Sequence, residues 1–192
     1  MPNYSKQILA TQRRKKIELM KITDIMNLGK DYIQAQVIIH ANIKSVDETR
    51  LWFFNICTGC KGKIEMKEKN FICEKCNRRI PQPEKKFQLA IVASDETAEM
   101  EISLGDREVR TLIGQRAHTG LKENKNKITF PKILQTLTKK NVTIQLLIKE
   151  DNVLNKAPMY WASNICNGFY IPEDDTTQTT QTMQQTTSQV SQ

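Results

Sequence analysis

Several kinds of segment are missing from this sequence of 192 residues. No stretch approaches the run of about eighteen apolar residues that a membrane-spanning helix needs. The N-terminal stretch MPNYSKQILATQRRKK also lacks the apolar centre of a secretory signal. These absences predict a soluble, intracellular protein with no membrane partner. Because thiols stay reduced in that compartment, paired cysteines indicate metal ligands or redox catalysts rather than disulfides.

The usual sequence marks of catalysis are missing as well. There is no glycine-rich phosphate loop, no His-Glu-x-x-His motif and no pair of acidic residues at strand ends. Nor is there an internal repeat of the kind that builds a solenoid. We therefore expect a protein that is not an enzyme and has no small-molecule substrate.

Aromatic residues are scarce, at 6% of the chain, while lysine and arginine outnumber aspartate and glutamate by 29 to 21. The basic excess favours a polyanionic partner. The C-terminal segment contributes little to any core, because 13 of its last 17 residues are threonine or glutamine. We expect residues 172–192 to be a disordered tail and residues 1–30 to be a helical or linker segment with a helix over 5–20.

The remaining chain, residues 31–171, has the pattern of a small barrel. Strands are predicted at 32–43 and 51–57, then a hairpin at 87–94 and 97–104, and a last pair at 142–150 and 158–166 joined by a polar loop. Two helices precede the last pair: one runs from a capping Asp106 to Ile113 and ends at Gly114, and the other has Pro131 in its first turn and Asn141 after its last turn. This order predicts a mainly β fold, an OB-type barrel with short helices, which binds single-stranded nucleic acid on one face.

Four of the five cysteines form two C-x2-C pairs twelve residues apart, Cys57 with Cys60 and Cys73 with Cys76. Four thiolates at this spacing can converge on one tetrahedral ion, with a short hairpin between the pairs. The alternatives are an iron–sulfur site, which the polar surroundings disfavour, and a redox pair, which needs a helix N-terminus. We interpret residues 55–80 as an inserted zinc ribbon that folds around one structural Zn²⁺.

Nucleic-acid contacts are expected from aromatic side chains that can stack on bases and from nearby cations that can hold phosphates. Strand alternation places Trp52 and Phe54 on one face and Phe53 on the other, and one of Tyr160 and Trp161 must point outward. Phe71 can pack on the ribbon or meet a base. The candidate cations are Lys61, Lys63, Arg78, Arg79, Lys139 and Lys140.

A zinc ribbon inserted between the first strands of an OB barrel resembles the C-terminal OB domain of the replication protein A large subunit. The resemblance rests on LWFFNICTGCKGKI, FICEKCN, the hairpin KKFQLAIVASDETAEMEISL and VRTLIG, within a similarity from about Asp31 to Ile171. It implies a nuclear protein that binds single-stranded DNA in replication or repair, with a structural zinc ion. The telomerase-associated paralogue of that subunit is another relative, for which the ligand would be telomeric G-rich repeats.

Two departures from the family pattern bear on function. The second strand of the hairpin reads AEMEISL, with acids where the family has aromatics, and the chain ends in YIPEDDTTQTTQ and a Thr/Gln tract rather than an amphipathic helix. Partner subunits, whether replication protein A-like small subunits or telomerase, are therefore implied by the resemblance and not by the tail. The alternative function is a protein-interaction scaffold with only weak DNA binding.

Overall fold

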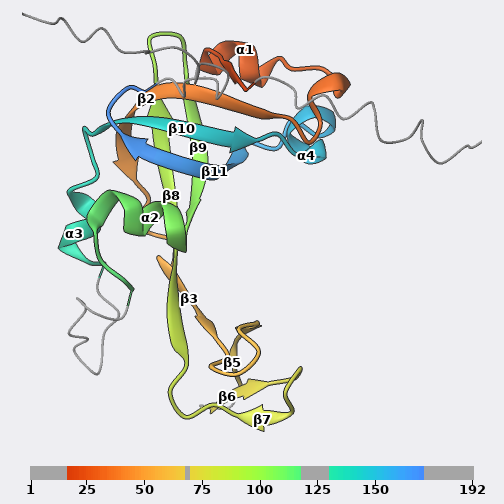
Figure 1. Ribbon diagram of the computed structural model, residues 1–192, viewed down its shortest axis with the longest axis vertical. Coiled ribbons are helices and arrows are strands. Elements are labelled where there is room, and N and C mark those ends of the chain that lie inside the picture. Colours follow the sequence, from red (N-terminus) through yellow and green to blue (C-terminus); the bar gives the residue numbers. More distant parts are fainter. Residues whose placement is uncertain (1–16, 68–69, 118–129, 171–192) are drawn as a thin grey trace, which may run out of the picture.

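Five strands close into a barrel in the computed structural model, which describes residues 17–67, 70–117 and 130–170 (Figure 1). In order around the barrel they are β2 (Gln36–Val46), β8 (Glu84–Ser94), β9 (Glu99–Gly105), β11 (Met159–Asn167) and β10 (Asn141–Leu147), which pairs back with β2. Neighbours are antiparallel except β9 and β11, which run parallel. The closed five-stranded order confirms the predicted mainly β, OB-type fold.

The barrel core forms because apolar residues alternate with polar ones along each strand. Leu89, Ile91 and Ala93 of β8 point inward, and so do Ile102 of β9 and Ile144 of β10, all almost completely buried. Burying one such aliphatic side chain stabilises the fold by about 1.5–3 kcal/mol. The opposite side of the same strands carries polar and partly exposed residues.

The N-terminal segment is packed onto this barrel. Strand β1 (Glu18–Leu19) runs parallel to β2, so the predicted helix over 5–20 is wrong at its C-terminal end, and residues 1–16 lie outside the described ranges. Helix α1 (Ile22–Met26) buries Ile22 and Ile25 in the main core, and a 3-10 turn, η2 (Lys30–Tyr32), follows. Part of the segment that we assigned to a linker therefore belongs to the folded unit. The predicted tail at 172–192 also lies outside the described residues.

Helix α2 (Asp106–Ile113) spans the predicted residues and ends at Gly114, which adopts the left-handed conformation at φ 70°. The predicted cap is wrong: Gly105 occupies the N-cap position, and Asp106 is the first helical residue. Helix α3 (Lys132–Gln135) is shorter than predicted. It gives way to turns in which Leu137 and Thr138 donate to the carbonyls three residues back, and Lys139, with φ 69°, then donates its N–H to the carbonyl of Ile43 before β10 begins.

A short helix interrupts the loop that we expected between the last two strands. Helix α4 (Glu150–Leu154) forms around Asn152, whose amide donates to the carbonyls of Ala157 and Met159 while its oxygen accepts the N–H of Lys149. The segment is polar and has no apolar periodicity, which is why its sequence predicts a loop. No helix among the described residues is long and apolar enough to cross a membrane.

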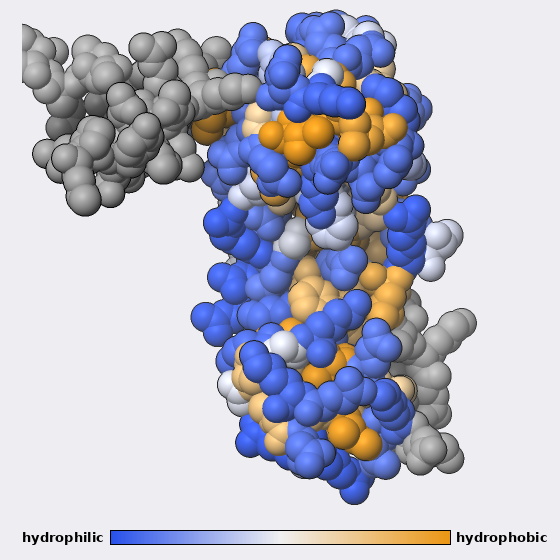
Figure 2. All heavy atoms as spheres, turned by 90° about the vertical axis from the view of Figure 1, so that its right-hand side faces the viewer, coloured by the Kyte–Doolittle hydropathy of each residue, from blue (hydrophilic) through white to orange (hydrophobic). Residues whose placement is uncertain are grey.

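The inserted segment projects from one end of the long strand β8 (Figure 1). Strand β3 (Phe53–Ile56) pairs with β8 where β8 extends beyond the barrel, and the ribbon strands follow. They are β4 (Lys63–Ile64), β5 (Met66–Lys67), β6 (Asn70–Cys73) and β7 (Arg78–Arg79). Figure 2 shows a mainly hydrophilic surface with small hydrophobic patches over the barrel and the ribbon. The ribbon thus stands apart from the barrel and has its own small core.

Candidate metal centre and nucleic-acid interface

The four ribbon cysteines converge. Their sulfur atoms all lie within 4.8 Å of one another, with Cys57 Sγ 3.8 Å from Cys76 Sγ and Cys60 Sγ 3.6 Å from Cys73 Sγ. A tetrahedral thiolate site with metal–sulfur distances of about 2.3 Å has sulfur–sulfur edges of about 3.8 Å. The donor set and its spacing therefore fit one metal ion, with no ligand position left open.

Each cysteine pair lies on a tight turn with a matching backbone. The residue after the second cysteine has positive φ in both turns: Lys61 at 60° and Asn77 at 48°. In the first turn the N–H of Gly59 donates to Cys57 Sγ, and in the second the N–H of Cys76 donates to Cys73 Sγ, each at 3.4 Å. These turns aim both sulfurs of a pair in one direction.

Hydrogen bonds among the cysteine turns shift the pKa values of the thiols. The N–H of Cys60 is the main cause that lowers the pKa of Cys57 to about 6. The hydrogen bond with the Cys60 thiol, together with burial, raises the pKa of Cys76 to about 12. The N–H of Gly62 chiefly lowers the pKa of Cys60 as well, so two of the four thiols favour the thiolate form that binds a metal cation. The electrostatics thus favour a bound metal cation.

The small ribbon core is built around the same cysteines. Cys57, Cys73, Ile64 and Ile80 are its buried members, and Phe71 packs against them. Of the two roles open to Phe71 in the sequence, the structure favours packing at the metal centre over contact with a base.

The candidate aromatic residues divide between the core and the outer face. Trp52 is only 3% exposed, with its ring 4.5 Å from that of Phe53 and 5.9 Å from that of Phe87. It precedes β3 on a bend, so strand alternation does not apply to it and it is not available for stacking. Tyr160 is also buried, and burial raises the pKa of its hydroxyl. Trp161 is 39% exposed and is the outward member of its pair.

Trp161 and Phe54 lie on one continuous outer face, which follows from the strand register. Phe54 is directly opposite Lys86 on β8, and Ala90 on the same side of β8 is opposite Ser103 of β9. Ser103 is in turn opposite Trp161 of β11. Residues directly opposite one another project to the same side of a sheet. We call this side, from Phe54 to Trp161, the outer face.

A lysine stands over each aromatic ring of the outer face. Lys149 Nζ lies 3.8 Å from the ring centre of Trp161, and Lys63 Nζ lies 5.9 Å from that of Phe54. Lys63 was expected from the sequence. Lys149 was missed, because the loop and α4 separate it from Trp161 along the chain and only folding brings the two together.

A groove of about 420 Å³ lies at the end of the barrel where α1 and α4 meet β8, β9 and β11. Its lining comes from α1, β8, β9, the segment between β10 and β11, and β11 itself: Met26, Val92, Glu99, Met100, Glu101, Asn152, Lys156, Ala157, Pro158 and Tyr160. The acids of the AEMEISL strand therefore line it. Glu99 pairs with Lys44, and Glu101 lies 3.6 Å from Arg50 Nη2, so both carboxylates are partly neutralised.

The basic candidates lie in different surroundings. Arg78 approaches the metal centre, with its Nη2 4.0 Å from Cys57 Sγ, and Arg79 is exposed on β7. Lys139 and Lys140 lie at the entry to β10, where Lys140 Nζ donates to the carbonyl of Leu112. The structure thus places Arg78 beside the cysteine cluster and the side chain of Lys140 against the last turn of α2.

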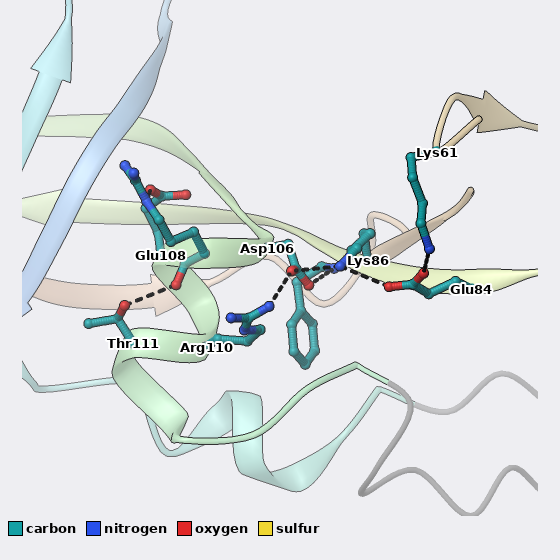
Figure 3. Close-up of polar contacts among 9 residues, drawn as sticks. Lys61, Glu84, Lys86, Asp106, Glu108, Arg110 and Thr111 are labelled. Carbon is teal, nitrogen blue, oxygen red and sulfur yellow. Dashed lines mark hydrogen bonds and ion pairs between the residues drawn. The ribbon is translucent and has the colours of Figure 1, made fainter. Parts of the chain in front are cut away.

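A chain of ion pairs connects the first cysteine turn to α2 (Figure 3). Glu84 accepts from Lys61 Nζ at 2.8 Å and from Lys86 Nζ at 2.9 Å. Lys86 Nζ also lies 3.4 Å from Asp106, which pairs with Arg110 at 3.2 Å. The hydrogen bond from Lys61, followed by that from Lys86, lowers the pKa of Glu84 to about 2. We call these five residues the junction network; no sequence pattern predicts it.

Comparison with known proteins identifies relatives of this fold. The family model described as Replication factor-A C terminal domain matches residues 36–161. A search among curated proteins returns no match.

Two solved structures are similar. One is a replication protein A heterotrimer bound to single-stranded DNA, with 23% identity and a TM-score of 0.64 over 79% of this chain and 36% of that chain. The other is yeast RPA bound to single-stranded DNA, with 22% identity and a TM-score of 0.61 over 79% of this chain and 88% of that chain. The chain thus spans little more than a third of the first relative's length. At these identities the likeness is one of fold.

Proposed function

Because this chain belongs to the family of the replication factor-A C-terminal domain, we propose that it binds single-stranded DNA along its outer face. The observation that carries the proposal is the pairing of Trp161 with Lys149 and of Phe54 with Lys63 on that one face. Both solved relatives are bound to single-stranded DNA, which supports the same ligand here.

The outer face offers what a sequence-tolerant single-strand site needs. An exposed ring stacks on a base and contributes on the order of 1–3 kcal/mol per base. The ammonium of a neighbouring lysine then lies beside the stacked nucleotide, where it neutralises a phosphate. A strand that runs from Phe54 past Trp161 would continue toward the groove between α1, α4, β8 and β9.

We further propose that the metal is one structural zinc ion. Four cysteine thiolates are a donor set that zinc favours, and they leave no position for a water nucleophile. Zinc would hold the two cysteine turns together and keep β3, with Phe54, in place against β8. The proposed role is binding without catalysis.

The test of DNA binding is fluorescence anisotropy with labelled oligo-dT at low salt. We expect binding that weakens steeply as salt rises and that does not require Mg²⁺ or a nucleotide. Trp161→Ala should weaken it by roughly 5- to 100-fold, the loss of one stacked base.

Phe169→Ala is the matched control. Phe169 is an exposed aromatic that stacks on His40 of β2, away from the outer face, so its loss should leave affinity unchanged. If the wild-type protein does not bind at low salt, single-stranded DNA is not its ligand, and a protein-interaction scaffold becomes the better proposal.

We place this binding in nuclear DNA metabolism, either in replication and repair or in telomere maintenance. Partner subunits are part of the proposal, since one solved relative is a heterotrimer. Affinity for telomere-like G-rich repeats compared with oligo-dT of equal length separates the two roles. A strong preference for the repeat supports a telomeric role with telomerase as partner, and similar affinities support replication with small subunits as partners.

A further inference from the structure

We propose that Glu84 and Asp106 compete with DNA phosphates for the cations of the junction network, so that they limit the protein's affinity for single-stranded DNA. The proposal rests on the proposed function and adds to it a pair of residues that oppose binding. Carboxylate and phosphate oxygens have the same charge sign and accept the same lysine N–H donors, so one can replace the other.

The junction network lies where the strand would pass. Lys86 is directly opposite Phe54, so the two side chains are neighbours on the outer face. Lys61 belongs to the first cysteine turn, and its side chain is 61% exposed. A nucleotide stacked on Phe54 therefore brings its phosphate close to the ammonium groups that Glu84 holds.

The geometry of Glu84 suits a competitor. Its two oxygens each engage a different lysine, at 2.8 Å and 2.9 Å, much as the oxygens of a bridging phosphate would. Asp106 also holds two cations, but both through its Oδ2, which lies 3.4 Å from Lys86 Nζ and 3.2 Å from Arg110 Nη1 (Figure 3). Together they line a hollow of about 150 Å³ in which cationic residues outnumber acids: Glu84, Lys85, Lys86, Asp106, Arg110, Arg116 and Ala117.

DNA binding must disrupt these ion pairs, which costs free energy. When a phosphate takes over Lys61 or Lys86, the carboxylate that loses its cation is left next to another anion, and like charges repel. Neutralising that carboxylate removes the repulsion and leaves the cations to the phosphate. The wild-type affinity should therefore be lower than that of a protein in which residue 84 is uncharged.

Glu84→Gln is the direct test, because it keeps the shape and an accepting oxygen while removing the charge. By anisotropy with oligo-dT at low salt, it should bind at least about threefold more tightly than wild type. Glu96→Gln is the matched control. It removes the same charge from an ion pair with Lys21 at the hairpin turn, the opposite end of β8, and should change affinity by less than about twofold.

Two further variants distinguish competition from a structural effect. Asp106→Asn keeps an oxygen for the N–H of Phe87 and should also tighten binding. In a Lys86→Met background, Glu84→Gln should increase the affinity for oligo-dT by a smaller factor, because one of the cations for which Glu84 and the phosphate compete is absent. Metal content and thermal midpoint of each variant show whether the ribbon is intact.

Unchanged or weaker binding by both Glu84→Gln and Asp106→Asn, in folded proteins with a full complement of metal, overturns the proposal. That result would mean that the carboxylates orient the lysines for DNA instead of opposing it. It is distinct from failure of the proposed function, in which the wild-type protein itself does not bind.

Discussion

The carboxylate of Asp95 accepts hydrogen bonds from both the N-terminal helix and the β8–β9 turn of the barrel. Its Oδ2 accepts the N–H of Ile22 at 2.9 Å, and its Oδ1 accepts the N–H groups of Thr97 and Ala98 in the hairpin turn. Burial opposes its charge, but the hydrogen bonds from Thr97, Ile22 and Ala98 outweigh burial and lower the pKa of Asp95. One side chain thus orders both a turn and the start of α1.

We therefore predict that Asp95→Ala destabilises the protein by about 1–3 kcal/mol, the cost of leaving several donors without their partner. Urea unfolding with metal in excess measures it. Glu96→Ala, which removes only an exposed ion pair with Lys21, should cost less than about 1 kcal/mol.

Asp95 also makes the free energy of unfolding depend on pH. Because the pKa of Asp95 is lower in the folded state than its usual 3.8, its contribution is full above that value and is lost as pH falls through the folded pKa. The difference in unfolding free energy between wild type and Asp95→Ala should narrow only in that acidic range. A difference that narrows near neutral pH would contradict this assignment.

At the scale of elements, the ribbon depends on its metal. Two of the four buried residues in its core, Cys57 and Cys73, are themselves expected ligands, so too little apolar surface remains to fold it alone. The barrel has a separate and much larger core. Its strands do not need the ribbon to bury their inner faces.

We predict that metal removal unfolds the ribbon and leaves the barrel folded. Hydrogen exchange should lose protection in β4 and β6 after chelation and keep it in β2 and β10. Cys60→Ser should abolish stoichiometric zinc, whereas Cys166→Ser, in β11 and outside the cluster, should retain one ion per chain. Protection that persists in β6 of a protein shown to be metal-free would refute a structural metal.

On the scale of the whole molecule, the outer face extends from β3, at the base of the ribbon, across β8 and β9 to β11 of the barrel. Phe54 lies on β3 and Trp161 on β11, with β8 and β9 between them. The two rings share no contact, so each should stack on a different nucleotide of one bound strand.

This separation predicts additivity. For a long oligonucleotide, the losses in binding free energy from Phe54→Ala and Trp161→Ala should sum to that of the double variant within about 0.5 kcal/mol. For oligonucleotides of about 4 nucleotides, the short end of the range for one OB fold, the second substitution should cost less than the first. Strong non-additivity with the long strand would place both rings at one nucleotide.

Several features could be predicted from the sequence because they depend on local pattern. The two C-x2-C turns, the alternating hairpin β8–β9 and the helix that ends at Gly114 each follow from residues close together in the chain. The errors came where tertiary packing, or a side-chain hydrogen bond without apolar periodicity, decides the structure. Trp52 is buried by Phe53 and Phe87, and α4 is held by the hydrogen bonds of Asn152.

The sequence by itself thus determined the four-cysteine centre, the order of strands and the barrel class, since spacing and periodicity encode them directly. Only the tertiary structure decided that Trp161 and not Tyr160 faces outward, that Lys149 covers it, and that Glu84 and Asp106 share Lys86. The physical reason is register. Which side chains meet across neighbouring strands depends on how those strands align, and that alignment is fixed by the packing of the whole barrel.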